Sequence, residues 1–64
     1  MEAIVDKLRE RLREEEKDIE VYESLMHEAR KKGMLHLADA LYLIMKDEES
    51  HRDYLEIYLR EWDH

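Results

Sequence analysis

The apolar residues of this 64-residue chain recur at alternating intervals of three and four positions on both sides of its single glycine, Gly33. Before the glycine, the positions with this spacing are Val5, Leu8, Leu12, Glu15, Ile19, Tyr22, Met26 and Ala29. After it they are Met34, Leu37, Leu41, Ile44, Glu48, His51, Leu55, Tyr58 and Trp62. This is the a/d heptad pattern of helices that pack side by side, so each half of the chain is predicted to carry one buried seam.

Two helices and one turn account for the whole pattern. The chain has no proline and one glycine, which are too few turn-forming residues for a multi-stranded sheet. The basic run Arg30-Lys31-Lys32 suits the last turn of a helix, and glycine is the residue preferred just beyond a helix end. We therefore predict an all-α chain with a single domain over 1–64: a helix over about 3–31, a turn around Gly33 and a helix over about 35–62, folded as an antiparallel helical hairpin.

Composition excludes several classes of protein. Without cysteine there is no disulfide, thiolate zinc site or cysteine nucleophile. The net charge of −7 argues against a nucleic-acid partner, because phosphate binding needs a basic surface. No apolar run approaches the length of a membrane span or of a signal-peptide core, so we expect no membrane partner and a cytoplasmic protein. Abundant Glu, Lys and Arg without Asn or Gln is typical of thermophile proteins, and also of designed helical sequences.

Three polar residues interrupt the apolar seams: Glu15, Glu48 and His51. A buried carboxylate is costly unless it is paired, protonated or bound to a cation. Glu48 and His51 are three positions apart, so they project from one face of their helix. Glu15 lies 18 residues before Gly33, and the other two lie 15 and 18 residues after it, so an antiparallel hairpin brings all three to about one level. A Glu facing a Glu-x-x-His pair is half of a carboxylate-bridged dimetal site, and we predict these residues as its ligands.

One hairpin supplies too few ligands for two metal ions. Two hairpins related by a twofold axis supply four carboxylates and two imidazoles, and the four carboxylates balance the charge of two divalent cations. A chain this short also has a marginal core of its own. We therefore predict an obligate homodimer that forms a four-helix bundle. The alternative is that the polar seam residues only set register and partner choice in a bundle without metal.

The stretch from Glu15 to Leu59 resembles one helix-pair half of the ferritin-like rubrerythrins. The resemblance rests on Glu15, on Tyr22 seven positions later, on Gly33 at the turn and on the block Asp47-Glu48-Glu49-Ser50-His51. It implies a ferritin-like four-helix bundle with a non-haem di-iron centre: two Fe ions per dimer, with Mn as an alternative, held by the predicted ligands of both chains. It also implies a di-iron oxidoreductase that acts on peroxide or oxygen, as a peroxidase or a ferroxidase.

The resemblance also suggests roles for residues around the metal ligands. Tyr22 matches a tyrosine that hydrogen-bonds a ligand carboxylate, although its spacing equally suits a core aromatic. Asp18 stands where rubrerythrins carry an extra ligand Glu, but it is one methylene shorter and is also explained as a solvated acid. Tyr54, beside His51, is either a redox-active or supporting phenol or a packing residue. The cysteine-ligated iron domain of rubrerythrin is absent, so electrons would come from an external donor.

Two alternatives to an oxidoreductase stay open: a non-catalytic iron- or manganese-binding protein, and a metal-free helical oligomerisation module. Apolar side chains outside the seams add a prediction about assembly. Four of them, Leu35, Tyr42, Leu43 and Ile57, would face outward from a four-helix dimer. A stripe of this kind usually marks a further interface, so we predict that oligomers larger than the dimer can form.

Overall fold

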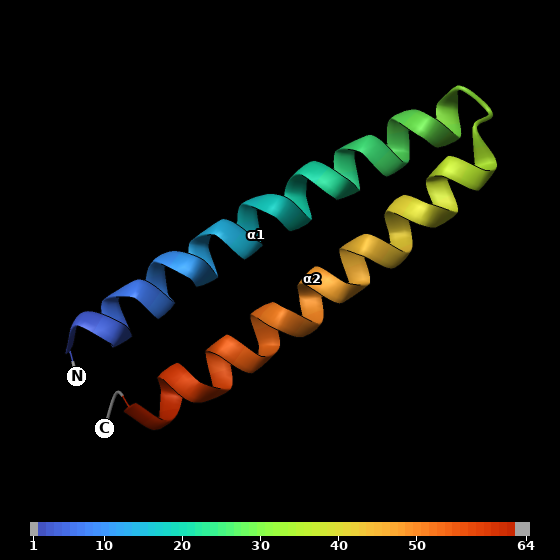
Figure 1. Cartoon of the computed structure of the whole chain (residues 1–64). Helices are drawn as coiled ribbons and strands as arrows, with labels where there is room; N and C mark the ends of the chain where they lie inside the picture. The colour runs from blue at the N-terminus through green and yellow to red at the C-terminus, as the bar shows by residue number, and fades with distance from the viewer. Residues whose placement is uncertain (1, 63–64) are drawn as a thin grey trace.

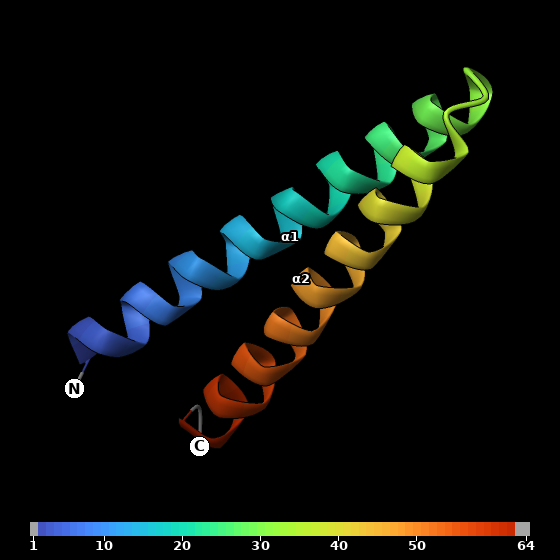
Figure 2. The same cartoon turned by 45° about the vertical axis from the view of Figure 1, so that its right-hand side comes forward.

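Two long α-helices, α1 (Glu2–Lys31) and α2 (Leu35–Trp62), lie side by side and antiparallel, with the turn at one end and both termini at the other (Figures 1 and 2). This computed structural model describes the backbone of residues 2–62 and the side chains of residues 3–61. No strand occurs within that range, so the predicted all-α class is confirmed. Each helix begins and ends within one residue of the position expected from the sequence.

The turn between the helices is built around Gly33, whose φ of 74° lies in the left-handed region. The N–H of Gly33 donates to the carbonyl of Arg30 at 3.0 Å, and the N–H of Met34 donates to the carbonyl of Ala29 at 2.9 Å. These two bonds form a Schellman motif, which satisfies carbonyls that the end of a helix leaves without partners. The glycine therefore ends α1 and reverses the chain.

The core is a single line of contact between the two helices. On α1 the predicted seam is the buried face: its most enclosed members are Glu15, Ile19, Met26 and Ala29. On α2 the most enclosed residues are Ala38, Met45 and Leu59. Most of these side chains form one cluster, with Leu41 and Tyr22 packed against it.

The predicted seam of the second helix is therefore only half correct. Leu41, Glu48 and Leu55 are partly buried, as expected. The other described seam positions, Met34, Leu37, Ile44, His51 and Tyr58, are exposed, and the side chain of Trp62 lies outside the described residues. Of the residues that directly follow these positions on α2, Ala38, Met45 and Leu59 are buried instead. A single neighbouring helix covers only one flank of an a/d seam, and spacing alone does not say which flank.

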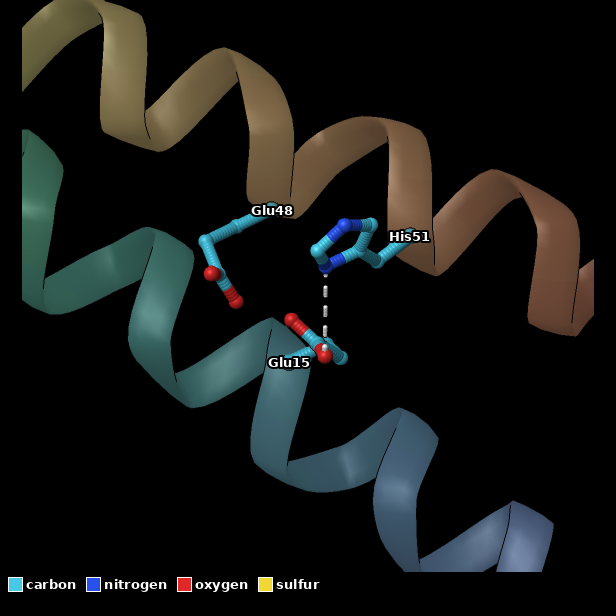
Figure 3. A group of neighbouring side chains, drawn as sticks. All are labelled: Glu15, Glu48 and His51. Carbon is cyan, nitrogen blue, oxygen red and sulfur yellow. Dashed lines mark ion pairs between the residues drawn. The ribbon is translucent and has the colours of Figure 1, made fainter.

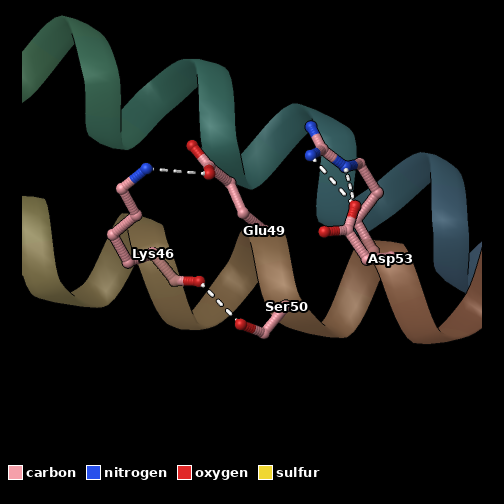
Figure 4. A network of polar contacts seen from close by, with 5 residues as sticks. Lys46, Glu49, Ser50 and Asp53 are labelled. Atoms are coloured by element: carbon pink, nitrogen blue, oxygen red, sulfur yellow. Dashed lines mark hydrogen bonds and ion pairs between the residues drawn. The ribbon is translucent and has the colours of Figure 1, made fainter.

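The exposed half of that seam forms one side of the hairpin, which we call the open face. It comprises Leu25 of α1 together with Met34, Leu37, Ile44, His51 and Tyr58 of α2. Near the turn, Leu25, Met34 and Leu37 line a shallow groove between the helices. The outer surface of α2 is mixed: Leu43 and Ile57 are exposed on it, beside polar contacts such as the ion pair of 3.3 Å between Lys46 and Glu49 (Figure 4). Neither helix, over the residues described, has a stretch apolar enough to cross a bilayer.

The hairpin is more extended than a compact protein of the same chain length. It measures 47 × 14 × 13 Å, and its radius of gyration is 14.7 Å, where about 11 Å is expected for a compact chain of this length. Its accessible surface is 5215 Å², where a compact monomer of 7.9 kDa exposes about 4,400 Å². The excess arises because each helix is covered along only one line.

Candidate metal centre

The middle of the hairpin brings together the three polar residues that interrupt the seams. Glu15 projects from α1 toward α2, and Glu48 and His51 project back from successive turns of α2 (Figure 3). One donor atom from each residue lies within 4.8 Å of the other two. Nδ1 of His51 lies 3.7 Å from Oε1 of Glu15. The cluster forms because Glu15 and His51 lie equally far along the chain from Gly33, 18 residues on either side, in antiparallel helices of the same rise per residue.

The three side chains differ sharply in burial. Glu15 is 3% exposed, and Glu48 is partly buried. The side chain of His51 is 58% exposed, since it belongs to the open face. The cluster therefore spans the boundary between the contact line of the two helices and the side of the hairpin that has no neighbour.

Two carboxylate oxygens in the cluster lack partners. Oε2 of Glu15 and Oε2 of Glu48 are both shielded from solvent, and neither has a hydrogen-bond partner within the described residues. While both carboxyls are ionised, neither can donate to the other. A shielded oxygen without a donor is costly, so the pair needs a proton or a cation.

The pKa values of the two carboxyls move in opposite directions. Hydrogen bonding with Glu48 lowers the pKa of Glu15, and the same interaction together with burial raises the pKa of Glu48. The charge of Asp18 raises the pKa of Glu48 further. Of the two carboxyls, Glu48 therefore binds a proton more readily, and that proton can be shared with ionised Glu15. A divalent cation would take the place of that shared proton.

The cluster has a neighbour that the sequence analysis missed, Arg11. Its Nη2 donates to Oε1 of Glu15 at 3.0 Å, and its Nη1 donates to Oε2 of Glu14 at 2.6 Å. The guanidinium helps to hold the pKa of Glu15 low. The spacing of four residues along one helix between Arg11 and Glu15 permits this pair, but the sequence contains many pairs with that spacing.

The other predicted site residues lie around the cluster rather than in it. Tyr22 packs against the buried apolar cluster, and within the described residues its hydroxyl has no hydrogen bond to Glu15 or Glu48. Asp18 is partly buried and acts on the cluster through its charge. Tyr54 is 68% exposed and lines a separate shallow groove on the outer surface of α2. Whether any of them supports redox chemistry stays a prediction.

Two carboxylates and one imidazole form a donor set that suits divalent iron, manganese or zinc. Comparison of the chain with protein-family profiles, with curated proteins and with solved structures gives no match. The chemistry open to the chain therefore follows from the geometry of Glu15, Glu48 and His51, and the rubrerythrin resemblance stays a hypothesis.

Proposed function

We propose that this chain is a rubrerythrin-like or ferritin-like di-iron protein whose site forms between two copies. The observation that carries the proposal is the cluster itself. Donor atoms of Glu15, Glu48 and His51 converge within 4.8 Å of one another, and two of the shielded carboxylate oxygens have no hydrogen-bond partner among the described residues. These orphaned oxygens fit a divalent metal, because a cation satisfies both without a donor.

The surface of the hairpin supports the dimer. Its accessible area exceeds that of a compact monomer by about 800 Å², which is close to what each partner contributes to a standard protein interface. The open face is apolar at most of its positions and carries the exposed His51. A second hairpin against this face would cover the apolar residues and bring a second set of ligands to the first.

In the proposed site Glu15 and Glu48 hold the metal ions by their oxygens, and His51 by a ring nitrogen. Iron, when bound, supplies one-electron redox chemistry with peroxide or oxygen. The protein contributes the rest: the carboxylates fix the ligand positions between two helices, and apolar residues limit access by water. Electrons would come from an external donor, because the chain has no cysteine for an iron–sulfur or rubredoxin-type centre of its own.

One contact favours the alternative of a metal-free oligomerisation module. Arg11 already places a positive charge on Oε1 of Glu15, which offsets part of the cost of that carboxylate without any metal. It leaves Oε2 of both glutamates without partners, however, so this contact accounts for only part of the cluster.

The decisive experiment measures metal content beside molar mass. We expect about one iron or manganese ion per chain in a dimer, after reconstitution under anaerobic conditions. A monomer that retains no metal would refute both the oxidoreductase and the non-catalytic metal protein. If metal is bound, oxidation of the ferrous protein by peroxide or oxygen, followed by its optical spectrum, separates these two. Rapid oxidation with turnover supports the oxidoreductase, and a ferrous site that does not respond supports simple binding.

A further inference from the structure

Arg11 and the proposed metal compete for one atom. The guanidinium donates to Oε1 of Glu15, and this oxygen also lies nearest to His51. A cation bound between Glu15 and His51 would repel the guanidinium and take its acceptor. The Arg11 side chain is 53% exposed, so it is free to swing away from Glu15 toward the open face. Metal binding would therefore remove the carboxylate partner of Arg11 and allow its guanidinium to pair with another carboxylate.

Four residues on the open-face side of α1 recur every seven positions and so form one line along the helix. They are Ile4, Arg11, Asp18 and Leu25. The order apolar, basic, acidic, apolar is self-complementary in an antiparallel pair. A twofold axis between positions 14 and 15 sets Arg11 opposite the partner's Asp18, and Ile4 opposite the partner's Leu25. A parallel pair would instead oppose like charges, which is unfavourable.

The open face of α2 indicates the same axis independently. Ile44 and Tyr58 are each seven residues from His51, so an antiparallel copy centred on His51 sets Ile44 opposite the partner's Tyr58. His51 lies 18 residues after Gly33, and the axis on α1 lies 18.5 residues before it. The two levels differ by about 0.75 Å at the rise of an α-helix. Both helices thus place the axis at the level of the Glu15, Glu48 and His51 cluster.

We propose that Arg11 links metal binding to dimer formation: without metal it neutralises Glu15 of its own chain, and with metal it pairs with the partner's Asp18 across an antiparallel dimer. Within the described side chains of residues 3–61, Asp18 has no ion-pair partner, so its carboxylate is open to that contact. Each dimer would contain two such pairs. By linkage, metal then tightens the dimer, and dimer formation tightens metal binding by the same factor. The metal-dependent part rests on the proposed function, whereas the orientation of the two chains does not.

Single cysteines test the orientation, because the chain has none of its own. Ile4→Cys and Leu25→Cys proteins are purified separately, mixed and oxidised. The antiparallel dimer predicts that the mixed disulfide, which joins one Ile4→Cys chain to one Leu25→Cys chain, dominates over either homodimer. Dominant cross-linking of Ile4→Cys to itself would overturn the proposed arrangement.

Substitutions that replace a charged side chain by an uncharged one test whether Arg11 links metal binding to dimer formation. The dimer dissociation constants of Asp18→Asn, Arg11→Gln and the double variant are measured by sedimentation, with EDTA and with Mn²⁺. For Asp18→Asn we expect dimer affinity to fall about tenfold with Mn²⁺ and to change by less than about twofold with EDTA. The double variant should be no weaker than either single variant with Mn²⁺. Asp6→Asn is the matched control, since Asp6 faces Arg9 of its own helix at 3.8 Å, and should change neither value.

The outcomes separate the two proposals. If Asp18→Asn changes the dimer dissociation constant equally with EDTA and with Mn²⁺, the proposed link between metal binding and dimer formation is overturned. The same holds if the substitution changes the constant in neither condition. In both cases wild-type binding of one metal per chain would leave the proposed function standing. If the wild-type protein binds no metal, the proposed function and the proposed link both fail, and the cross-linking result still decides the orientation.

Discussion

Nδ1 of His51 lies 3.7 Å from Oε1 of Glu15, although the two residues are 36 positions apart in the chain. The imidazole is 58% exposed, whereas the carboxylate is 4% exposed. This pair therefore reaches from the contact line of the two helices to the open face. A metal held between the two residues would be enclosed on the Glu15 side and accessible on the His51 side, which gives it a route of entry before a second chain covers it.

Replacing His51 with alanine tests whether its imidazole is a ligand. Because the side chain is mostly exposed, we expect the free energy of unfolding to change by less than about 0.5 kcal/mol. Metal affinity should fall at least about tenfold, since loss of even a group that supports a ligand costs that much. Equilibrium dialysis with Mn²⁺ measures it. His36→Ala, also exposed on α2, is the control. Equal affinities in the two variants would contradict the assignment.

Glu48→Leu separates metal binding from structural roles. The variant should lose stoichiometric metal. Its metal-free form should gain about 1 kcal/mol in the free energy of unfolding, because an apolar side chain replaces a shielded carboxyl. Urea titration with EDTA measures the gain, and elemental analysis measures the loss. Glu56→Leu, at another partly buried position of α2, should keep its metal. If Glu48→Leu retains full metal content, Glu48 is not a ligand.

The paired carboxyls predict how stability depends on pH. The pKa of Glu48 is raised by its hydrogen bond with Glu15, so the folded protein holds this proton more tightly than the unfolded chain. The free energy of unfolding contributed by Glu48 is therefore fully present at low pH and is lost as pH rises from the ordinary glutamate range through the raised pKa. The lowered pKa of Glu15 acts oppositely, and its contribution is lost as pH falls through that value.

Urea titrations of the metal-free protein between about pH 2 and pH 8 measure this dependence. Glu48→Gln keeps a donor toward Glu15 at every pH, so we expect it to remove the loss of stability on the alkaline side. Glu15→Gln should instead remove the loss on the acid side. Identical pH profiles for wild type and Glu48→Gln would show that the two carboxyls do not share a proton.

Gly33→Ala tests the turn without touching the site. An added Cβ would meet no atom within 4 Å, so any cost comes from the φ of 74°, which disfavours residues with a side chain. We expect the free energy of unfolding to fall by about 1 kcal/mol, measured by urea titration, with metal stoichiometry unchanged. A substitution without effect on stability would mean that the chain reverses by some other conformation in solution.

The class, the turn and the level of the three ligands could be predicted because each depends on local chemistry. Helix-forming residues, a glycine after a basic turn and a fixed rise per residue are properties of the sequence itself. The rotation of α2 could not be predicted. Leu37 and Ala38, or Ile44 and Met45, are adjacent apolar residues, and only packing against α1 decides which of them is buried.

Arg11 marks a different limit of the sequence analysis. The spacing of four residues between Arg11 and Glu15 is visible in the sequence. A chain this rich in charge contains many oppositely charged residues at that spacing, however, and pairs of this kind are mostly exposed. What distinguishes this pair is that its carboxylate is shielded, and burial is known only once both helices are in place. A supporting residue such as Arg11 is therefore harder to predict than ligands that interrupt an apolar seam.

Two neighbouring residues of α2 test whether the open face is the dimer interface. Ile44 belongs to the open face, and Leu43 points outward from the hairpin; both are exposed in the single chain, so a lysine at either position should leave the hairpin folded. Ile44→Lys would bury a charge against the partner's Tyr58, and we expect dimer affinity to fall at least about a hundredfold.

Sedimentation and metal content measure the result for both variants. With Ile44→Lys, metal should fall below one ion per chain, because neither chain completes the site of the other. With Leu43→Lys the dimer and its metal should persist, and only oligomers larger than the dimer should be lost. The reverse pattern, a dimer lost with Leu43→Lys and kept with Ile44→Lys, would place the interface on the outer surface of α2 and leave His51 open to solvent.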